Sequence, residues 1–569
     1  MKRIKLCYLA ILVLMSITIA NASPDRSGDF SLLDTEGNFH QLSRYRHQDA
    51  LVLMAFNESC SSMDNALSKF KKLQERFEDK PLSFALIRSP SRMGTEYVGN
   101  DRALDELNMP LLLDDGQLVS EAIAFSKIGE IAVLDPQQLG ILYRGGISEK
   151  ANAVLIGQAE TEGATIREAA DGCDLRYPVK ERHISLVPDY ASEIAPIIQD
   201  KCASCHREDG IGPFAMDSHL MLQGWSPMIK EVLLTKRMPP AQVDPSIGHF
   251  TNARYISDLE MQKLVHWIDA GSPRGASLED PLAQIEFSNR FDWQLGEPDY
   301  IVTAPKHEIP ATGVLDYINV DVALPFKQDK WVEAVQYIAG DESVLHHLLT
   351  YVTAPKEEVE GEAARGNATT RFLEGYAPGK VDAMTFPKNT GVYIPANHKL
   401  SMQFHYTTNG RATSDQTILG LYFHDEPPRH ENFTQSVSGM FRIPPYARDY
   451  EASARYLFKE DTVVTGLRAH MHFRGKDMRF SAEYPDGRFS ELLNVPNYSY
   501  AWQPTYELAE PVLLPAGTKV HVTGAFDNSE HNPANPDPSK ELTFGLQSWD
   551  EMFIGYWTYH SAKPIKSVK

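Results

Sequence analysis

Potential metal ligands stand in four short groups that are far apart in the second half of this chain. Side chains two apart on a β-strand point to the same face, so His470 and His472 can reach one ion from a strand. Adjacent residues face opposite ways, so His346 and His347 can share an ion only at a strand end or a bulge. If these groups bind metal together, the fold must bring distant segments of the chain close to one another, which limits the folds that the chain can adopt. The four groups are His346-His347, Gln403-Phe404-His405, His470-Met471-His472 and Asp550-Glu551-Met552.

The donor atoms in these groups favour copper. Imidazoles suit several transition metals, whereas a thioether selects reduced copper over zinc, magnesium or calcium. Taken singly, the residues have ordinary alternatives. A His-x-His pair is as often solvated or hydrogen-bonded as metal-bound, and Met552, between Trp549 and Phe553, is by itself better explained as a core methionine. Only the combination predicts a copper protein.

From residue 285 onward, short runs rich in β-forming residues alternate with turns that contain Pro, Gly and Asn. This pattern predicts antiparallel β-sandwiches. We place a boundary between two such domains near Glu426-Pro427-Pro428. Examples of the runs are residues 300–303, 400–406, 417–423 and 520–523.

The series HH, QFH, RAHMH and DEM, followed four residues later by Tyr556, resembles the copper type II, ascorbate-dependent monooxygenases, such as peptidylglycine α-hydroxylating and dopamine β-monooxygenases. The resemblance covers roughly the last half of the chain. It implies two tandem all-β, jelly-roll-like sandwiches, residues 285–425 and 426–565, with one copper ion in each. The ligands that it implies are His346, His347 and His405 for an electron-relay copper, and His470, His472 and Met552 for an oxygen-activating copper.

Three further positions match the same family. By this resemblance Gln403 is a copper-proximal glutamine, and Arg468 and Tyr556 are substrate contacts, so these three are the candidate catalytic residues. An arginine and a phenol can hold a substrate carboxylate by charge-assisted hydrogen bonds. The family's third substrate contact, an amide two residues after the methionine, is here Ile554, and the family's disulfides have no counterpart in this half. A peptidylglycine substrate is therefore not expected.

Residues 202–206 have the sequence Cys-Ala-Ser-Cys-His, which is the c-type haem attachment pattern. Cys202 and Cys205 would form thioethers with the haem, and His206 would be an axial ligand. A zinc site is less favoured, because no second C-x-x-C lies nearby. Met238, followed by two prolines, resembles the distal methionine of cytochromes c, and His/Met ligation favours electron transfer. The competing methionines, each better explained as core packing, are Met216, Met221 and Met228.

We predict a small α-helical cytochrome c domain at residues 184–280, which carries one covalently bound haem c and follows a linker at residues 151–183. Ser257 and Glu260 have the spacing of a capping box at the start of its last helix. Gly271 stands where that helix should end.

Residues 28–150 alternate between buried-strand and helical patterns, which predicts an α/β domain. The phrase at residues 30–37, and Cys60 at a strand-to-helix turn, resemble the redoxin (thioredoxin-like) family. Met63 replaces the second cysteine of a C-x-x-C pair, so a structural or docking role is favoured over thiol chemistry. Pairing of Cys60 with Cys173 stays open, because the sequence does not show how close their Cα atoms come.

The chain has 569 residues, enough for three or four domains, and its 42% hydrophobic content can give each a core. Residues 1–22 have a basic start, a short apolar segment and a small-residue cleavage box, which predicts a secretory signal peptide; a retained anchor is the alternative. Losing its three basic residues would change the formal charge from −21 to −24, which opposes nucleic acid and anionic lipid. We expect a periplasmic or secreted protein with no membrane span after cleavage.

The sequence thus predicts a secreted copper-dependent monooxygenase that hydroxylates an unidentified small-molecule or peptide substrate with O2. Electrons from a periplasmic donor would pass through the haem to the three-histidine copper and then to the other copper. The alternative is a non-catalytic periplasmic electron-transfer or copper-binding protein, in which Gln403, Arg468 and Tyr556 have no role. A third possibility keeps the redoxin domain as a thiol partner, which requires a free Cys60.

Overall fold

In the computed structural model, the chain divides into two units. The predicted signal peptide, residues 1–22, lies outside the described residues. No helix in the described part of the chain is both long and apolar enough to cross a membrane. The described residues are 25–90, 108–158, 164–208, 210–240, 242–287, 291–355, 371–377 and 383–565. Within these ranges, the first unit comprises residues 25–28, 45–90 and 108–176, and the second comprises residues 29–44 and 177–565.

The first unit is an α/β domain around a six-stranded sheet. The strands and helices are β3 (Ala50–Phe56), β4 (Leu82–Arg88), β5 (Leu111–Leu113), β6 (Ile131–Asp135), β7 (Gly140–Gly145), β8 (Ile166–Arg167), α1 (Met63–Arg76), α3 (Leu118–Ile123) and α4 (Glu149–Leu155). The strand order is β5-β4-β3-β6-β7-β8, with β3, β4 and β5 parallel and β6 antiparallel to both β3 and β7. This is a thioredoxin-like arrangement. The central strand β3 is buried at every position, which explains its continuous apolar sequence.

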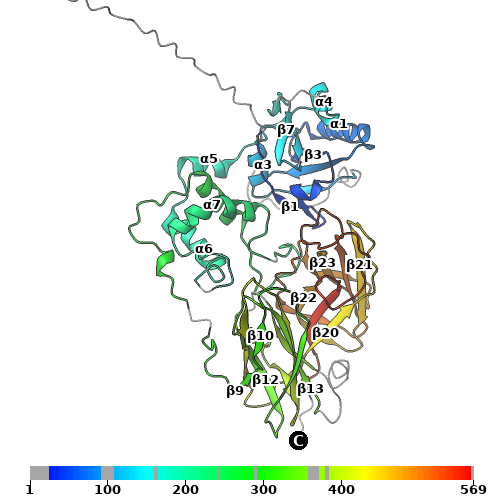
Figure 1. Ribbon diagram of the computed structural model, residues 1–569. Helices are drawn as coiled ribbons and strands as arrows, with labels where there is room; N and C mark the ends of the chain where they lie inside the picture. Colours follow the sequence, from blue (N-terminus) through cyan, green and yellow to red (C-terminus); the bar gives the residue numbers. More distant parts are fainter. Residues whose placement is uncertain are drawn as a thin grey trace, which may run out of the picture. The chain divides into compact units, whose positions relative to one another are not determined.

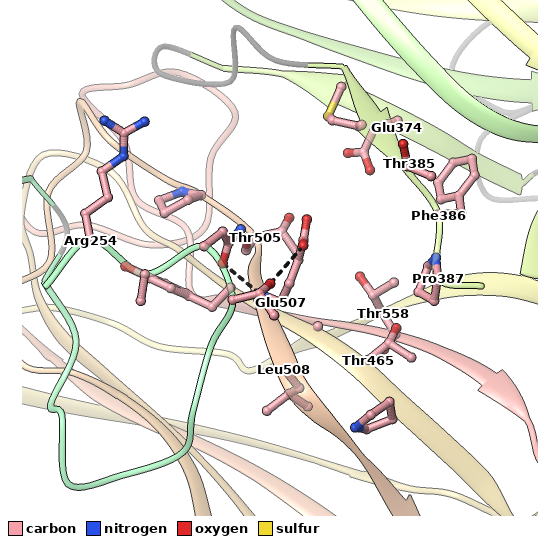
Figure 2. A pocket seen from close by; sticks show the side chains of 18 of the residues that line it. Arg254, Glu374, Thr385, Phe386, Pro387, Thr465, Thr505, Glu507, Leu508 and Thr558 are labelled. Carbon is pink, nitrogen blue, oxygen red and sulfur yellow. Dashed lines mark hydrogen bonds between the residues drawn. The ribbon is translucent and has the colours of Figure 1, made fainter. Parts of the chain in front are cut away.

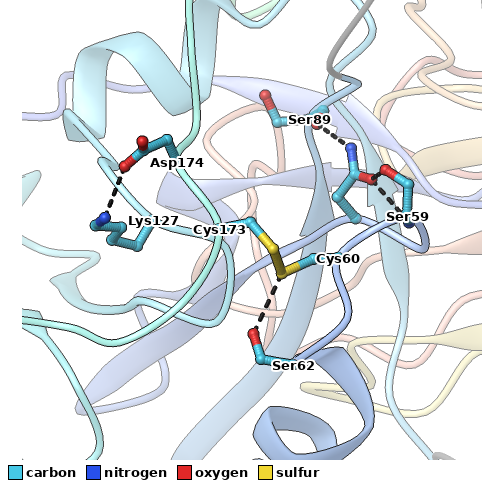
Figure 3. Close-up of a disulfide and its surroundings, with 8 residues drawn as sticks. Ser59, Cys60, Ser62, Ser89, Lys127, Cys173 and Asp174 are labelled. Atoms are coloured by element: carbon cyan, nitrogen blue, oxygen red, sulfur yellow. Dashed lines mark hydrogen bonds and ion pairs between the residues drawn. A yellow bond between two sulfur atoms is a disulfide. The ribbon is translucent and has the colours of Figure 1, made fainter.

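A disulfide joins Cys60 to Cys173 in this unit, with their Cα atoms 5.9 Å apart (Figure 3). Cys60 lies in the turn between β3 and α1. Cys173 is brought to it by a short segment that pairs with residues 126–128: the Ile128 N–H donates to the Cys173 carbonyl at 2.9 Å, and Lys127 pairs with Asp174. The sequence analysis left this pairing open. In the structure Cys60 is in a disulfide, so it does not provide the free thiol that a thiol-partner role requires.

A hairpin near the N-terminus belongs to the second unit. It consists of β1 (Ser31–Leu33) and β2 (Phe39–Gln41), with η1 (Leu42–Tyr45) after it. The hairpin turn contacts the C-terminal sandwich: Asn494 Nδ2 donates to the Gly37 carbonyl at 2.9 Å, and Arg479 Nη2 donates to the Glu36 carbonyl at 2.7 Å. Part of the redoxin-like phrase at residues 30–37 therefore packs with the β-rich half.

A helical segment opens the main part of the second unit (Figure 1). Its elements are α5 (Pro178–Ser185), η2 (Tyr190–Ile194), α6 (Ala195–Lys201), α7 (His219–Leu234), α8 (Asp258–Asp269) and η3 (Leu282–Gln284). Ile197, Leu222 and Leu264 meet in one apolar core. The predicted capping box of Ser257 and Glu260 is formed at the start of α8, and Gly271 follows that helix with a φ of +85°. These local predictions are confirmed.

The first β-sandwich follows. One sheet has the order β11-β17-β13-β14, and the facing strands are β16-β12-β19-β9, with β15 beside β12. Val335 of β12 and Leu348 of β13 lie in one core between the sheets. The bounds are β9 (Tyr300–Thr303), β10 (His307–Ile309), β11 (Ile318–Ala323), β12 (Lys330–Ile338), β13 (Leu345–Thr353), β14 (Arg371–Tyr376), β15 (Met384–Thr385), β16 (Thr390–Ile394), β17 (Lys399–Tyr406), β18 (Thr413–Asp415) and β19 (Ile418–Phe423).

The second sandwich pairs the strands β25-β22-β27-β20 with the sheet β21-β26-β23-β24. Leu467 and Trp557 from the first sheet pack with Phe480 and Val522 from the second. Its strands are β20 (His430–Ser438), β21 (Tyr450–Leu457), β22 (Thr462–His470), β23 (Gly475–Glu483), β24 (Phe489–Val495), β25 (Tyr506–Leu514), β26 (Lys519–Phe526) and β27 (Ile554–Ser561). Parallel pairing of β16 with β20 joins one sheet of each sandwich, and together these form a continuous nine-stranded sheet. The β-rich C-terminal half is thus as predicted.

Candidate metal and haem sites

The three histidines of the first sandwich meet on neighbouring strands. His347 of β13 lies opposite His405 of β17, and the pairing register shifts between Leu345 and His347. His346 is the extra residue at this shift, so both adjacent imidazoles can turn to one side, as the sequence argument requires. One nitrogen from each of His346, His347 and His405 lies within 4.8 Å of the other two.

The nitrogens of this group are set up to bind an ion. The Nδ1 atoms of His346 and His347 face each other at 3.1 Å, and His405 Nδ1 is buried without a hydrogen-bond partner among the described residues. Burial lowers the pKa of His346 and that of His405 to about 4, and it lowers the pKa of His347 well below its ordinary value. Neutral imidazoles with free lone pairs are what a transition metal binds.

Gln403 lies on β17 two residues before His405, so it points to the same face of the sheet. Its Nε2 donates to Asn319 Oδ1 at 3.2 Å. The described contacts thus place Gln403 beside β11, on the same face as His405, rather than in hydrogen-bond contact with an imidazole.

Met552 and His470 approach each other in the second sandwich. Met552 Sδ lies 3.3 Å from His470 Nε2, and the His470 and His472 ring centroids are 5.4 Å apart. His470 Nδ1 donates to Gln503 Oε1 at 2.6 Å, which leaves Nε2 directed at the sulfur. The three predicted ligands of this site are therefore together.

The sequence analysis predicted that His470 and His472 lie on one strand and point to the same face, but His472 lies outside the strand. Strand β22 ends at His470, and His472 lies in the turn that follows. Its backbone N–H donates to Glu551 Oε2 at 2.9 Å, and the Arg474 N–H donates to Glu551 Oε1 at 2.8 Å. His472 Nδ1 lies 3.3 Å from the Asp550 carbonyl, which leaves its Nε2 available.

Glu551 and Arg474 support this turn from inside the protein. Both side chains are fully buried, with 3.6 Å between Arg474 Nη1 and Glu551 Oε1. Arg474 also donates to Asn528 Oδ1 and to the Trp549 carbonyl. Burial raises the pKa of Glu551 to about 7, although the two N–H donors and the guanidinium oppose that rise. The sequence analysis missed this pair; the position of Glu551 beside Met552 was the only signal for it.

Burial also lowers the pKa values of the second pair of histidines, to about 3 for His470 and about 4 for His472. Next to them, Arg468 lies opposite Tyr556 in the β22–β27 pairing, with the guanidinium carbon 4.5 Å from the ring centroid. Arg468 is buried, and among the described residues no carboxylate lies within ion-pair distance of it. The Tyr556 ring is 6.1 Å from that of His470, so Arg468, Tyr556 and His470 share one face.

Tyr500 separates the two histidine groups. Its ring stacks on His346 at 4.7 Å with an angle of 21° between the planes, and it meets His472 edge-on at 5.7 Å. Its hydroxyl lies 2.6 Å from Ser548 Oγ. Tyr500 therefore contacts one histidine of each group. The distance between the ring centroids of His346 and His472 cannot exceed the sum of these two centroid distances. Tyr500 belongs to none of the sequence motifs, so its position between the two groups could not be predicted.

The C-x-x-C-H segment follows α6 directly. His206 is buried, and its Nδ1 lies 3.1 Å from the Phe214 carbonyl, which leaves Nε2 free to bind an axial position. A Cβ on Gly212 would come within 2.8 Å of the His206 ring, so only glycine fits there. Cys202 and Cys205 are not paired with each other, and burial raises the pKa of the Cys202 thiol to about 12.

Apolar side chains lie open around this segment. The Phe214 ring centroid lies 5.0 Å from that of His206 and 4.6 Å from that of Trp225, which is 36% exposed. Met238, the predicted distal ligand, is also 36% exposed. Met216 is buried in the core as predicted, but Met228 is 47% exposed on α7 rather than packed. Met228 points outward because it lies one residue before the buried Ile229.

Five other histidines of the β-rich half lie in neither group and have contacts of other kinds. His398 and His424 contact backbone carbonyls, His521 pairs with Glu483, and His560 contacts the Ser561 carbonyl. His430 stacks on His560 with ring centroids 4.5 Å apart.

No protein-family model and no curated protein matches this chain. Among solved structures, an uncharacterized conserved protein from Geobacillus kaustophilus is 20% identical with a TM-score of 0.24, over 28% of this chain and 94% of its own. A putative thiol-disulfide oxidoreductase from Bacteroides vulgatus is 17% identical with a TM-score of 0.21, over 25% of this chain and 99% of its own. A putative thioredoxin from Neisseria meningitidis is 13% identical with a TM-score of 0.20, over 25% and 95%.

Proposed function

We propose that this protein is a copper-dependent monooxygenase that receives electrons through a covalently bound haem c. The observation that carries the proposal is the 3.3 Å approach of Met552 Sδ to His470 Nε2, beside His472, with three more imidazoles gathered across Tyr500. Imidazole nitrogens together with a thioether form the donor set that selects cuprous copper. Secretion to the periplasm or beyond is part of the same proposal.

The residues of both sites fit copper. His405 Nδ1 is buried and unpaired among the described residues, which costs about 1–3 kcal/mol unless something binds it. Gln503 and the Asp550 carbonyl fix the second pair of imidazoles so that one nitrogen of each remains available. Copper, when bound, supplies the one-electron chemistry that activates O2 for attack on a C–H bond.

Arg468 and Tyr556 would bind the substrate. The Arg468 guanidinium has no carboxylate partner among the described residues, and a substrate carboxylate could pair with it by charge-assisted hydrogen bonds. Tyr556 orients the guanidinium through its ring face and lies beside His470. Ile554 stands where the related enzymes have an amide, so we propose an anionic substrate other than a peptidylglycine.

Cys202, Cys205 and His206 would hold the haem, with Met238 as the distal ligand. The exposed ring of Trp225, which stacks on Phe214 beside His206, is an apolar surface that a haem would cover, and Met238 is also exposed. Haem with His/Met ligation supplies one-electron transfer. Electrons would come from a periplasmic donor.

The test is oxygen consumption by the purified full-length chain with copper and a chemical reductant. The wild-type protein should bind two copper ions, and substrate should accelerate its use of O2. His472→Ala should bind one copper ion and lose that acceleration, with the haem spectrum unchanged. His521→Ala, which changes a surface histidine paired with Glu483, is the matched control and should behave as wild type. Binding of zinc in preference to copper, or a fully active His472→Ala, would reject the proposal.

The second candidate function is non-catalytic electron transfer or copper handling. It is favoured by the close approach of the two histidine groups through Tyr500, which suits electron exchange as well as it suits oxygenation. Arg468→Leu distinguishes the two. It should abolish substrate-accelerated O2 use in a monooxygenase and leave haem–copper electron exchange intact in either case.

A further inference from the structure

A segment of the helical part is built into the second sandwich as an extra strand. Residues 249–252 run beside β25: the Thr251 N–H donates to the Glu507 carbonyl at 2.9 Å, and the Ala509 N–H donates to the His249 carbonyl at 2.8 Å. Phe250 is buried in the core of that sandwich. The haem-motif segment is therefore attached directly to the domain that carries His470.

Arg254 lies just after this strand and reaches back to the haem motif. Its Nη1 donates to Ser204 Oγ at 2.9 Å and lies 3.4 Å from Cys205 Sγ. Cys205 Sγ is one of the two atoms that would carry the haem. The attachment point and the added strand are thus in direct contact.

Asn252 ties the same strand to the loop that supports His470. Its Nδ2 donates to the Thr505 carbonyl at 2.7 Å, and its Oδ1 accepts the Glu507 N–H at 3.0 Å. Two residues before Thr505, Gln503 Oε1 accepts the His470 Nδ1 proton at 2.6 Å. Short chain segments and hydrogen bonds therefore connect the haem attachment point to His470, and the residues of this connection are Cys205, Arg254, Asn252, Thr505, Gln503 and His470.

The connection runs along one wall of a cavity of about 390 Å³ (Figure 2). Arg254, Thr505 and Glu507 lie on one side, and Thr385 and Phe386 of the first sandwich lie across the opening. Electronic coupling decays faster through open space than along bonded and packed atoms. Since the cavity separates this wall from the first sandwich, electron transfer from the haem motif is favoured along the wall that carries Arg254, Asn252 and Thr505.

We propose that electrons from the haem enter the copper sites at His470, along Arg254, Asn252 and Gln503, and not at the three-histidine site. This inference rests on the proposed function. In the step, ferrous haem loses one electron and becomes ferric, and one cupric ion held by His470, His472 and Met552 gains that electron and becomes cuprous. No bond forms or breaks, and no proton is transferred. The three-histidine site would then exchange electrons across Tyr500.

The test measures internal electron transfer in the full-length protein, without O2 or substrate. Both coppers are oxidised, the haem is reduced by a light pulse with a photosensitiser, and its reoxidation is followed by absorbance while the Cu(II) signals are followed by EPR. His405→Phe should lose only the three-histidine copper and keep fast haem oxidation. His472→Ala should lose haem oxidation by copper. Loss in His405→Phe, or an unchanged rate in His472→Ala, would overturn the inference.

Variants along the wall test the route itself. Arg254→Leu and Asn252→Ala should each slow haem oxidation by about tenfold or more, the equivalent of about 1.4 kcal/mol in the barrier. Thr251→Val is the matched control, because it removes only the Thr251 Oγ1 contact with Glu507 from the same strand, and it should change the rate by less than about twofold. Copper content and melting temperature are measured for each variant. A slow rate of haem oxidation is evidence for the route only in a variant that is folded and holds both copper ions. Equal rates in all three variants would overturn the route.

The outcomes separate this inference from the proposed function. A protein that passes haem electrons to the His470 site but hydroxylates nothing keeps the inference and rejects the oxygenase. A protein that hydroxylates its substrate but loses haem oxidation in His405→Phe keeps the oxygenase and rejects the inference.

Discussion

The two candidate copper sites are held by different kinds of structure. In the three-histidine site the sheet does the placing: His347 is opposite His405 on paired strands, and a one-residue bulge turns His346 to join them. In the other site β22 ends at His470, and a buried carboxylate, Glu551, holds the turn that carries His472. One site depends on strand register and the other on a single buried ion pair.

This difference predicts unequal fragility. Strand pairing is distributed over many hydrogen bonds, so no one side chain outside the ligands decides the first site. The second site concentrates its support in Glu551 and Arg474, which have no exposure to water. A change there should damage the His472 turn and leave the three histidines in place.

The largest effect of a single substitution is expected from Glu551→Ala. It leaves the Arg474 guanidinium buried without its carboxylate, which should cost about 3–5 kcal/mol of unfolding free energy. Copper should be lost from the His470 site and retained by the three histidines, as judged by metal analysis and EPR. The control is Glu541→Ala, which breaks an exposed pair with Arg442 and should cost less than about 1 kcal/mol. Equal losses in the two variants would contradict the comparison.

Acidification should destabilise the copper-free protein. The folded pKa values of His346, His405 and His472 are about 4, whereas in the unfolded chain they return to their ordinary value of 6.5. Between these pH values the unfolded chain binds protons that the folded one does not, so stability falls as pH falls through 6.5. The loss at pH 5 should be about 1–2 kcal/mol per histidine, measured by urea unfolding at pH 7.5 and pH 5. No loss between these pH values would show that the imidazoles are solvated.

Tyr500 allows the contact between the two sites to be tested. Tyr500→Leu removes the ring that stacks on His346 and should cost about 2 kcal/mol. Tyr500→Phe and Ser548→Ala each remove only the bond between the Tyr500 hydroxyl and Ser548, and should cost about 1 kcal/mol each. The free energies should be non-additive in the double variant Tyr500→Phe/Ser548→Ala, because both changes delete one interaction. Full additivity would exclude the contact.

The smallest effect on the copper-free protein is expected from His405→Phe. Phenylalanine can keep the stacking with Tyr317, whose ring centroid lies 4.5 Å away, and it removes a buried nitrogen that has no partner among the described residues. The unfolding free energy should change by less than about 1 kcal/mol without copper, whereas the stabilisation that added copper gives should shrink. Calorimetry with and without copper measures both. A large loss without copper would mean that His405 is a structural residue.

The grouping of the candidate ligands could be predicted from the sequence because the motifs that carry them are local. His346-His347, His405, His470 and Met552 each stand in a short motif, and the bulge at His346 followed from the rule that neighbours on a strand face opposite ways. The same holds for the capping box at Ser257 and for the apolar strands of the first unit. These features depend on residues close together in the chain.

The supports of the sites could not be predicted, because they depend on contacts between distant residues. Gln503 reaches His470 across 33 residues, and Glu551 reaches the His472 N–H across 79. Asn252 meets Thr505 only because the helical part adds a strand to the sandwich. The strand end at His470 also misled the alternation argument for His472, since periodicity alone does not show where a strand stops.

The bulge at His346 determines which changes in chain length this part of the protein can tolerate. Because the side-chain period of a strand is two, a shift by one residue turns the following side chains to the opposite face. Deleting His346, or inserting a residue between it and His347, would leave a single imidazole on the face of β13 that lies opposite the sandwich core. The loop before β13 can lengthen or shorten without this consequence, whereas at His346 and His347 the number of residues matters as much as their identity.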